Sequence, residues 1–387
     1  MTNTLVSLTN IPTPYRAHLY NALAQEMDAR DLGLHVLYMA KSEPGRFWTF
    51  DPQSHHYRYT FLKDWTLKLG RYELPFNPDI FSTLRSEPPR WLLVSGSWYF
   101  PTVQAAPLAL DRRQTVTLFW NESNLAYMER KSSPVNAWRR RTIDSYDAYV
   151  VPGAWAREYV LEYAPSARQK SFLKLPNVVN EILFRDRTAE LRKERAALRQ
   201  IWGCDSPEKA VLLTVARLEP IKGIRELVES LLGFEKLDHL ILLIAGTGAL
   251  QDELETRVRE AGKEANIRFI GYQAESQVLE LLALADGFLL PSLGDPYPLV
   301  VIEASFAQLP LLLSSRVGCH PESLQPGQNG LLFDPYQPES IREALRNFLS
   351  AGPGGWQAMG EHSLTNAEAV FSTRRVLPHF VDELENL

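Results

Sequence analysis

Short apolar runs alternate with helical stretches along the first half of the chain. Seven of these runs are typical of buried strands: 5–9, 34–39, 57–62, 91–96, 115–120, 148–152 and 172–175. Plausible helices lie between them, for example over residues 17–27 and 133–144. Strands that alternate with helices at this spacing predict βαβ units, and therefore a parallel sheet.

The same alternation starts again after a stretch, 175–180 (LPNVVN), that has the Pro and Asn of a linker. A charged helix over 188–200 opens this second series, and its predicted strands are 211–216, 240–245, 267–270, 288–290, 311–314 and 331–333. Two series of this kind predict two Rossmann-like α/β domains, 1–180 and 181–375, that face a central cleft, which is a preferred place for ligands. A terminal helix over 376–387 follows.

Composition narrows the class of protein. A length of 387 residues suits two or three domains, and 45% apolar with 22% charged residues is ordinary for a globular protein. The net charge of −5 gives no basic footprint for nucleic acid. The two cysteines, Cys204 and Cys319, offer no disulfide framework, which favours the cytoplasm. The N-terminus lacks the features of a signal peptide, and no run has the length of a membrane span. Peripheral contact with the inner face of a membrane stays open.

The stretch from Pro291 to Glu303 follows an apolar run and combines two carboxylates with a helix start. Pro298 suits the first helical position, where its missing N–H costs nothing. Asp295 then lies in the loop and Glu303 in the second helical turn, both near the carboxyl end of a parallel sheet, where such folds bind ligands. The alternative is structural: Asp295 caps a helix and Glu303 pairs with a nearby cation.

Two cations follow the first strand of the second series. Arg217 and Lys222 precede a helix, and helix N-termini favour anions. An Arg fork and a mobile Lys charge suit a diphosphate at this place. Two solvated surface cations are the structural alternative.

Taken in order, Arg217-x4-Lys222 and Asp295-x7-Glu303 resemble the signature of retaining glycosyltransferases of family 4 (glycosyl transferases group 1), which have the GT-B fold. The likeness is strong over 177–335 and weaker before. The family usually has Glu at the first acid, so Asp295 is one methylene shorter.

The resemblance implies transfer of a sugar from a nucleotide donor, with retention, to a glycan or lipid-linked acceptor in polysaccharide biosynthesis. Arg217 and Lys222 would stabilise the departing diphosphate, in place of a metal, while Asp295 would hold sugar hydroxyls and Glu303 the ribose. The nucleotide sugar is a substrate, and no cofactor is implied. Family frequency favours UDP-glucose or UDP-N-acetylglucosamine. In relatives the closing helix crosses back to the first domain, and helix 376–387 is a candidate for this.

Further donor contacts follow from the same resemblance. The turn at Gly246 and Gly248 fails the dinucleotide fingerprint, because Gln251 replaces its last glycine. It resembles the family's glycine turn. Tyr272 lies where the family often contacts the base, or else is a half-buried aromatic at a strand end. The remaining donor candidates surround Asp295 and open the next helix: Gly294, Leu299 and Val300.

Candidates in the first domain lie at three strand ends. Arg16 could face a phosphate or an acceptor, or be merely solvated. Gly96 and Ser97 would let a ligand approach closely. Asn121 and Glu122 stand where the family commonly carries a His. Glu122 is a candidate acid, base or acceptor-orienting group, or else a helix cap or a surface acid.

Two other functions remain open. A nucleotide-sugar epimerase of similar fold would need acid–base residues beside the sugar, for which Glu122 is the only good candidate. A non-catalytic sugar-nucleotide-binding protein would bind without turnover. Cys319 and His320 lack partner ligands at a usable spacing, so no metal site is predicted.

Overall fold

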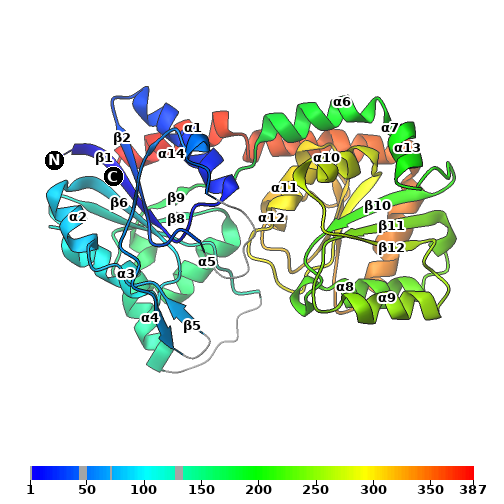
Figure 1. Ribbon diagram of the computed structural model, residues 1–387, viewed down its shortest axis with the longest axis horizontal. Coiled ribbons are helices and arrows are strands. Elements are labelled where there is room, and N and C mark those ends of the chain that lie inside the picture. Colours follow the sequence, from blue (N-terminus) through cyan, green and yellow to red (C-terminus); the bar gives the residue numbers. More distant parts are fainter. Residues whose placement is uncertain (1, 43–49, 70–71, 127–133) are drawn as a thin grey trace. The chain divides into compact units, whose positions relative to one another are not determined.

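The chain forms two compact domains, one from residues 1–178 with 373–387 and one from residues 179–372. The structure is a computed structural model that describes residues 2–42, 50–69, 72–126 and 134–387 (Figure 1). The divisions lie close to the predicted ones at 180 and 375.

The first domain is built on a parallel sheet of seven strands in the order β3-β2-β1-β6-β7-β8-β9. Its strands are β1 (Thr2–Thr9), β2 (Gly33–Tyr38), β3 (Arg58–Phe61), β6 (Pro89–Ser95), β7 (Val116–Trp120), β8 (Ala148–Val151) and β9 (Phe172–Lys174). Apolar residues bury the central strands on both faces, as in β6 from Trp91 to Val94. Two further strands, β4 (Leu67–Leu69) and β5 (Tyr72–Leu74), pair antiparallel outside this sheet, and the sequence pattern did not predict them.

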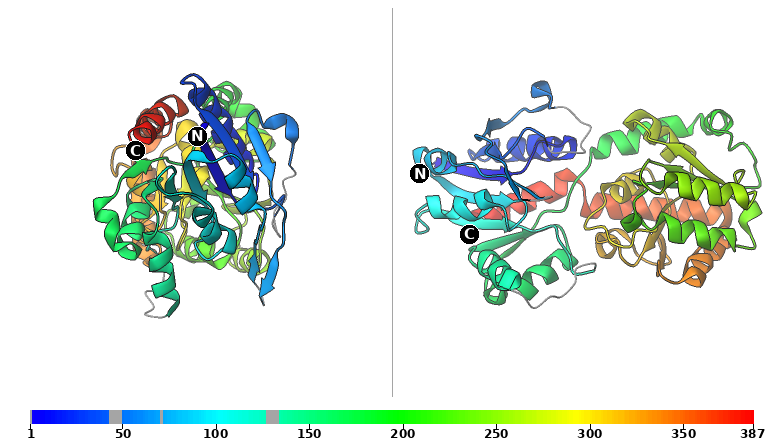
Figure 2. Two further views of the ribbon diagram at one scale, coloured as in Figure 1. Left: turned by 90° about the vertical axis from the view of Figure 1, so that its left-hand side faces the viewer. Right: turned by 60° about the horizontal axis from the view of Figure 1, so that its bottom comes forward.

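Helices of the first domain are α1 (Pro14–Asp28), α2 (Ile80–Ser86), α3 (Pro101–Ala105), α4 (Pro134–Asp144), α5 (Ala154–Tyr163) and α14 (Thr373–Glu385). The closing helix α14 packs against α1 (Figures 1 and 2). Its buried face, which includes Phe380 and Leu384, joins the core under β1 and β6. Arg30, just past α1, pairs with Asp382 and Glu385 of α14. The closing helix therefore belongs to the first domain.

The second domain has a parallel sheet of six strands in the order β12-β11-β10-β13-β14-β15. Its strands are β10 (Ala210–Val215), β11 (Leu240–Ala245), β12 (Ile267–Gly271), β13 (Gly287–Leu290), β14 (Leu311–Ser314) and β15 (Gly330–Phe333). Its helices are α6 (Thr188–Arg192), α7 (Arg195–Ile201), α8 (Ile224–Leu232), α9 (Gln251–Glu260), α10 (Glu275–Leu284), α11 (Leu299–Phe306), α12 (His320–Ser323) and α13 (Pro338–Val370).

Side chains alternate along β10 between two cores. Leu212 packs with residues of α8 and α9, while Val211 and Leu213 pack with residues of α10 and α11. These two helix pairs cover opposite faces of the sheet (Figure 1). Because every strand is parallel, all the loops that follow the strands gather at one edge.

Three predicted helix boundaries need correction. α1 begins at Pro14 rather than residue 17, with proline at its first position, so Arg16 is helical. α11 begins at Leu299, because Pro298 keeps an extended backbone and its carbonyl accepts the first turn's bond from the Val301 N–H (3.2 Å). The helix predicted over 188–200 is broken between α6 and α7.

Tertiary contacts explain this break. Arg192 on α6 donates to the Ala307 carbonyl, just after α11, while Arg195 on α7 donates to the Leu284 carbonyl (3.1 Å) at the end of α10. The two pieces are thus anchored to different helices, and the backbone leaves helical geometry at Glu194 (φ −101°, ψ 21°). Anchoring outweighs the helix propensity of the charged stretch.

Candidate functional site

The loops after β10 and β13 in the second domain are held against each other. Gly223 has φ +67°, and a Cβ there would lie 2.0 Å from the Pro291 carbonyl oxygen. The Leu293 N–H donates to the Ile221 carbonyl at 2.9 Å. Only glycine allows so close an approach with this backbone conformation, so the two loops are fixed relative to each other.

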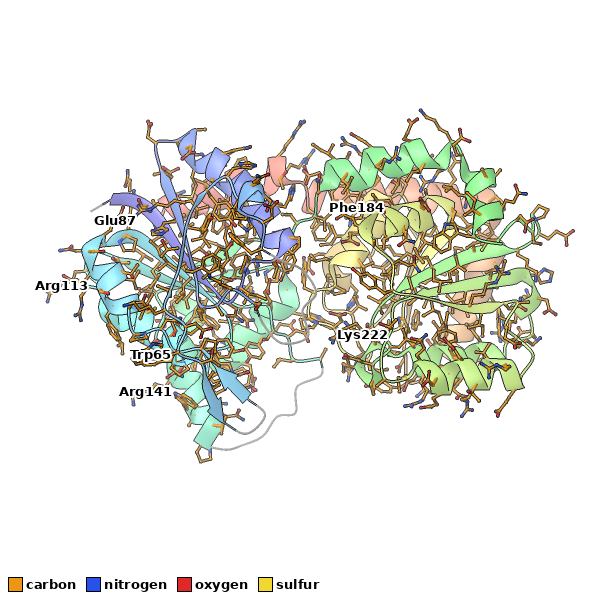
Figure 3. The ribbon with its side chains drawn as sticks, in the orientation of Figure 1. Trp65, Glu87, Arg113, Arg141, Phe184 and Lys222 are labelled. Atoms are coloured by element: carbon orange, nitrogen blue, oxygen red, sulfur yellow. The ribbon has the colours of Figure 1, made fainter. Side chains whose placement is uncertain are left out.

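This contact brings together Lys222 and Asp295, which are 73 residues apart in the sequence and form an ion pair. Their side chains are only 19% and 11% exposed. Backbone contacts hold the Asp295 loop, since its carbonyl accepts from the Gly318 N–H at 2.8 Å. Figure 3 shows Lys222 beside the start of α8. A cation and a carboxylate, both predicted to bind the donor, therefore bind each other in the structure.

Glu303 lies in the second turn of α11, as predicted, and is half-buried. No described residue forms a hydrogen bond or ion pair with its carboxyl group, so the predicted alternative of a pairing cation is wrong within the described chain. Burial raises the pKa of Glu303 to about 7, and the carboxylate of Glu275 adds to the shift. A half-buried carboxyl group that no protein group satisfies is well placed to accept hydrogen bonds from a ligand.

Arg217 does not join this pair. Its side chain is 67% exposed and bonds Glu219, two residues on, at 2.5 Å. Both predicted cations thus lie on the β10–α8 connection, but only Lys222 contacts a carboxylate from another loop. An exposed ion pair of this kind contributes little stability, so Arg217 is free to change partner at little cost.

The glycine turn after β11 is required by the protein's own backbone. A Cβ at Gly246 (φ +139°) would lie 1.9 Å from the Ala216 carbonyl oxygen, and one at Gly248 would lie 2.5 Å from that of Leu218. These glycines therefore press the loop after β11 onto the loop that carries Arg217. Beyond the next strand, Tyr272 is 71% exposed, so the predicted alternative of a half-buried aromatic is wrong.

The other donor candidates surround the start of α11. Gly294 is buried beside Asp295, and Leu299 and Val300 are half-buried at the first two helical positions. The first N–H groups of a helix have no partner inside it and attract anions. The N-terminus of α11, next to Asp295, therefore adds the partial positive charge of its helix dipole to this edge of the sheet.

The first domain holds a second cation–carboxylate pair at the carboxyl edge of its own sheet. Arg16 in α1 donates to Glu122 at 2.7 Å, and its guanidinium stacks over Trp120 with 3.7 Å to the ring centroid. Arg16 is 5% exposed and Glu122 is 34% exposed. Burial is the largest influence on Arg16 and lowers its pKa, but the Glu122 carboxylate together with Tyr15 and Tyr20 outweighs it, so the pKa is raised overall. The solvated Arg16 and the capping Glu122, offered as alternatives from the sequence, are both wrong.

Sequence reasoning singled out both residues without pairing them. They are 106 positions apart, and no spacing rule connects α1 to the end of β7. Trp120 was not predicted to take part. The one available signal was that all three lie at or after the carboxyl ends of predicted parallel strands.

The neighbouring candidates have structural partners. Asn121 is buried and donates to the Ser123 and Ala156 carbonyls, both at 2.9 Å, so its amide fixes the strand end. Gly96 has φ +117°, and a Cβ there would lie 2.4 Å from Asn10 Oδ1. Ser97 accepts a bond from the Phe100 N–H at 2.9 Å through its carbonyl. These three shape the loops around Arg16 and Glu122.

Two negative findings concern the described residues. None of their His, Cys, Asp and Glu side chains form a group of three or more that could hold a metal ion. The helices in these parts of the chain include none that is long and apolar enough to cross a membrane.

The part of the chain that contains this site matches a known protein family. Residues 198–359 match the family model of glycosyl transferases group 1. The match covers less than half of the chain and includes Lys222, Asp295 and Glu303. An uncharacterised glycosyltransferase of Methanocaldococcus jannaschii is 30% identical over 158 residues, 41% of this chain and 40% of that protein. A glycogen synthase of Mycobacterium tuberculosis is 34% identical over 141 residues, 36% of this chain and 34% of that protein. The chain therefore spans less than half the length of these two relatives.

Solved structures extend the comparison to the whole chain. The crystal structure of Anabaena HepE in complex with UDP superposes with a TM-score of 0.76 and 15% identity, covering 100% of both chains. The fold is GT-B. The predicted α/β fold class is confirmed, and the group 1 glycosyltransferase match lies in the second of its domains.

Proposed function

We propose that the chain is a retaining glycosyltransferase that transfers a sugar from a nucleotide donor to a glycan or lipid-linked acceptor in polysaccharide biosynthesis. The observation that carries the proposal is the half-buried, unpartnered Glu303 at the same sheet edge as the Lys222–Asp295 pair. UDP-glucose and UDP-N-acetylglucosamine are the favoured donors, because the fold neighbour HepE binds UDP and the family most often uses these sugars.

The ion pair suggests how a donor would be received. A diphosphate attracts the Lys222 ammonium more strongly than a single carboxylate does, since it offers more charge and more acceptor oxygens. Transfer of Lys222 from Asp295 to the diphosphate would free the Asp295 carboxylate for the hydroxyl groups of the sugar. Binding of the donor's diphosphate to Lys222 would then at the same time release the Asp295 carboxylate that binds the donor's sugar.

The remaining parts have matching roles. Glu303 would accept hydrogen bonds from the ribose hydroxyls, which gives its half-buried carboxyl group a partner. Lys222, Arg217 and the N-terminus of α11 would stabilise the negative charge that develops on the departing diphosphate. An oxygen of the departing diphosphate would take the proton of the attacking acceptor hydroxyl, so no protein base is assigned. Glu122, oriented by Arg16, is the candidate for holding the acceptor.

A thermal-shift screen of UDP-, GDP- and ADP-sugars without metal tests the donor site. Stabilisation by one nucleotide class, lost in Glu303→Gln and kept in Glu260→Gln, is the expected result. Glu260 is a suitable control because it is exposed at the far end of α9. No stabilisation by any nucleotide sugar would refute the site.

Turnover separates the proposal from its alternatives. Transfer to a glycan or lipid-linked acceptor, with the donor's anomeric configuration kept in the product as measured by proton NMR, is expected. Conversion of the donor alone would indicate an epimerase. Binding without turnover across many acceptors would indicate a non-catalytic binding protein.

A further inference from the structure

A groove lies at the amino edge of the second domain's sheet, opposite the edge that carries Lys222 and Asp295. Lys209 and Asp286 line it, and they immediately precede β10 and β13. Its volume is about 530 Å³, which is large enough for a small ligand. Because it borders the starts of the strands, it is separate from the proposed donor site.

One wall of the groove is positive. Arg195 and Arg199 on α7 share the Asp286 carboxylate at 2.6 Å each, and both donate through Nε to the Leu284 carbonyl at 3.1 Å. Asp286 also accepts from the Val211 N–H at 2.7 Å, so both of its oxygens already have partners. The Nη1 group of each arginine donates to no described residue. Two guanidinium donors therefore remain available beside the groove.

Two lysines that have no ion-pair partner among the described residues add positive charge to the groove. Lys209 and Lys236 line the groove, and neither forms an ion pair or a side-chain hydrogen bond with the described residues. Together with the two arginines, they outnumber the lining carboxylates, Glu208 and Asp286, by two. This positive excess stands out on a chain whose net charge is −5.

The kinked helix α13 contributes three apolar side chains to the lining of the groove, Leu349, Pro353 and Trp356. α13 is kinked at Gly352 (φ 62°), which is followed by Pro353. Trp356 lies in the first part of the helix after this kink. The Trp356 ring stacks on Phe348 with 4.9 Å between centroids and 13° between planes, and its N–H donates to the Phe348 carbonyl at 2.6 Å. Trp356 is thus held rigidly while it lines the groove.

We propose that this groove binds a phosphate monoester carried on a ring compound, such as a phosphorylated sugar. The free Nη1 groups of Arg195 and Arg199 and the ammonium groups of Lys209 and Lys236 would hold the phosphate, since guanidinium and ammonium groups are its usual protein ligands. The ring would lie against Trp356. This site is independent of the proposed glycosyl transfer.

Isothermal titration of the full chain with inorganic phosphate and with glucose 6-phosphate tests the proposal. The double variant Lys209→Gln/Lys236→Gln should bind both about tenfold more weakly than wild type, because each lost ammonium removes a charge-assisted contact. The control Lys63→Gln/Lys174→Gln loses the same charge from exposed sites in the first domain and should bind like wild type. Stabilisation by UDP-sugars should be unchanged in both, so failure here is distinct from failure of the donor site.

Two further measurements sharpen the assignment. Trp356→Leu should weaken glucose 6-phosphate but not inorganic phosphate, and equal effects on both would overturn the role of the ring. Co-sedimentation with phosphatidylglycerol–phosphatidylcholine vesicles asks whether the phosphate belongs to a lipid headgroup. If only the binding to vesicles is lost in the lysine variant, the phosphate that the groove recognises belongs to a lipid headgroup. Equal binding by wild type and the lysine variant in both assays, or binding by neither, would refute the site.

Discussion

Each domain joins two of its segments through a cation–carboxylate pair at the carboxyl edge of its sheet, but the pairs Arg16–Glu122 and Lys222–Asp295 are built differently. In the first domain Arg16 is 5% exposed and stacked on Trp120, while Glu122 is 34% exposed. In the second domain Lys222 and Asp295 are 19% and 11% exposed, and no aromatic ring of a described residue stacks on Lys222. A stacked guanidinium is fixed in place, whereas a lysine is a mobile point charge. The first pair is suited to orient a carboxylate, and the second to exchange one partner for another.

The largest expected effect follows from this exchange. Lys222→Ala removes the cation that we propose to follow the diphosphate through the reaction, so the rate of transfer should fall about 10²–10³-fold, as when one transition-state donor is lost. Steady-state kinetics with saturating donor measures this. Lys63→Ala, an exposed lysine in the first domain, serves as the matched control. A variant with unchanged kcat would show that Lys222 has only a structural bond to Asp295.

The donor-side residues were within reach of sequence reasoning because their roles depend on local order. Arg217, Lys222 and Asp295 lie in connections that follow strands predicted by the hydrophobic pattern, and Glu303 lies in the helix that follows one of them. Parallel strands bring their carboxyl ends to one edge, so the loops had to meet.

The partners within each site were not predictable in the same way. The pairing of Lys222 with Asp295 depends on the close packing of Gly223 against Pro291, where a Cβ would lie only 2.0 Å from the carbonyl oxygen. The pairing of Arg16 with Glu122 depends on packing between α1 and β7. The break between α6 and α7 likewise arises from contacts with α10 and α11 that no local pattern records. Side-chain partners and helix breaks belong to tertiary packing, which the spacing of apolar residues does not encode.

The second prediction concerns the fixed pair. Glu122→Ala leaves the buried Arg16 cation without its carboxylate and should destabilise the protein by about 2–3 kcal/mol. Arg16→Met leaves only a carboxylate that is already 34% exposed and can be hydrated, so it should cost about 1–2 kcal/mol. Thermal denaturation compares the two variants.

The double variant distinguishes a pair from two independent residues. Arg16→Met with Glu122→Ala should be less destabilised than the sum of the single changes, because neither charge is then left alone. Additive effects would mean that the 2.7 Å contact contributes no coupling. The Lys222–Asp295 pair should show weaker coupling by the same cycle if lysine is the mobile partner.

The smallest expected effect is the contribution of Glu303 to the pH dependence of the free energy of unfolding. Burial raises its pKa from 4.5 to about 7, so the folded protein holds a proton that the unfolded chain has released in this range. The associated stability is present below pH 4.5 and is lost as the pH rises through 7. Glu303→Gln cannot ionise, so relative to wild type it should gain about 1–2 kcal/mol between pH 5 and pH 8, allowing for partial exposure. Thermal denaturation at the two pH values measures this difference.

Donor binding should depend on pH in the opposite direction. Ribose hydroxyls donate hydrogen bonds, so they favour the ionised carboxylate and lower its pKa in the complex. Binding of UDP-glucose should therefore release a proton near pH 6.5 and weaken below pH 7, by up to about tenfold per pH unit. Titration calorimetry in buffers of different ionisation enthalpy detects that proton, and Glu303→Gln should release none. A nucleotide affinity that is flat from pH 5.5 to 8 in wild type would mean that Glu303 does not contact the donor, whatever the family resemblance implies, because a carboxyl group that titrates in this range cannot gain a ligand without its proton equilibrium shifting.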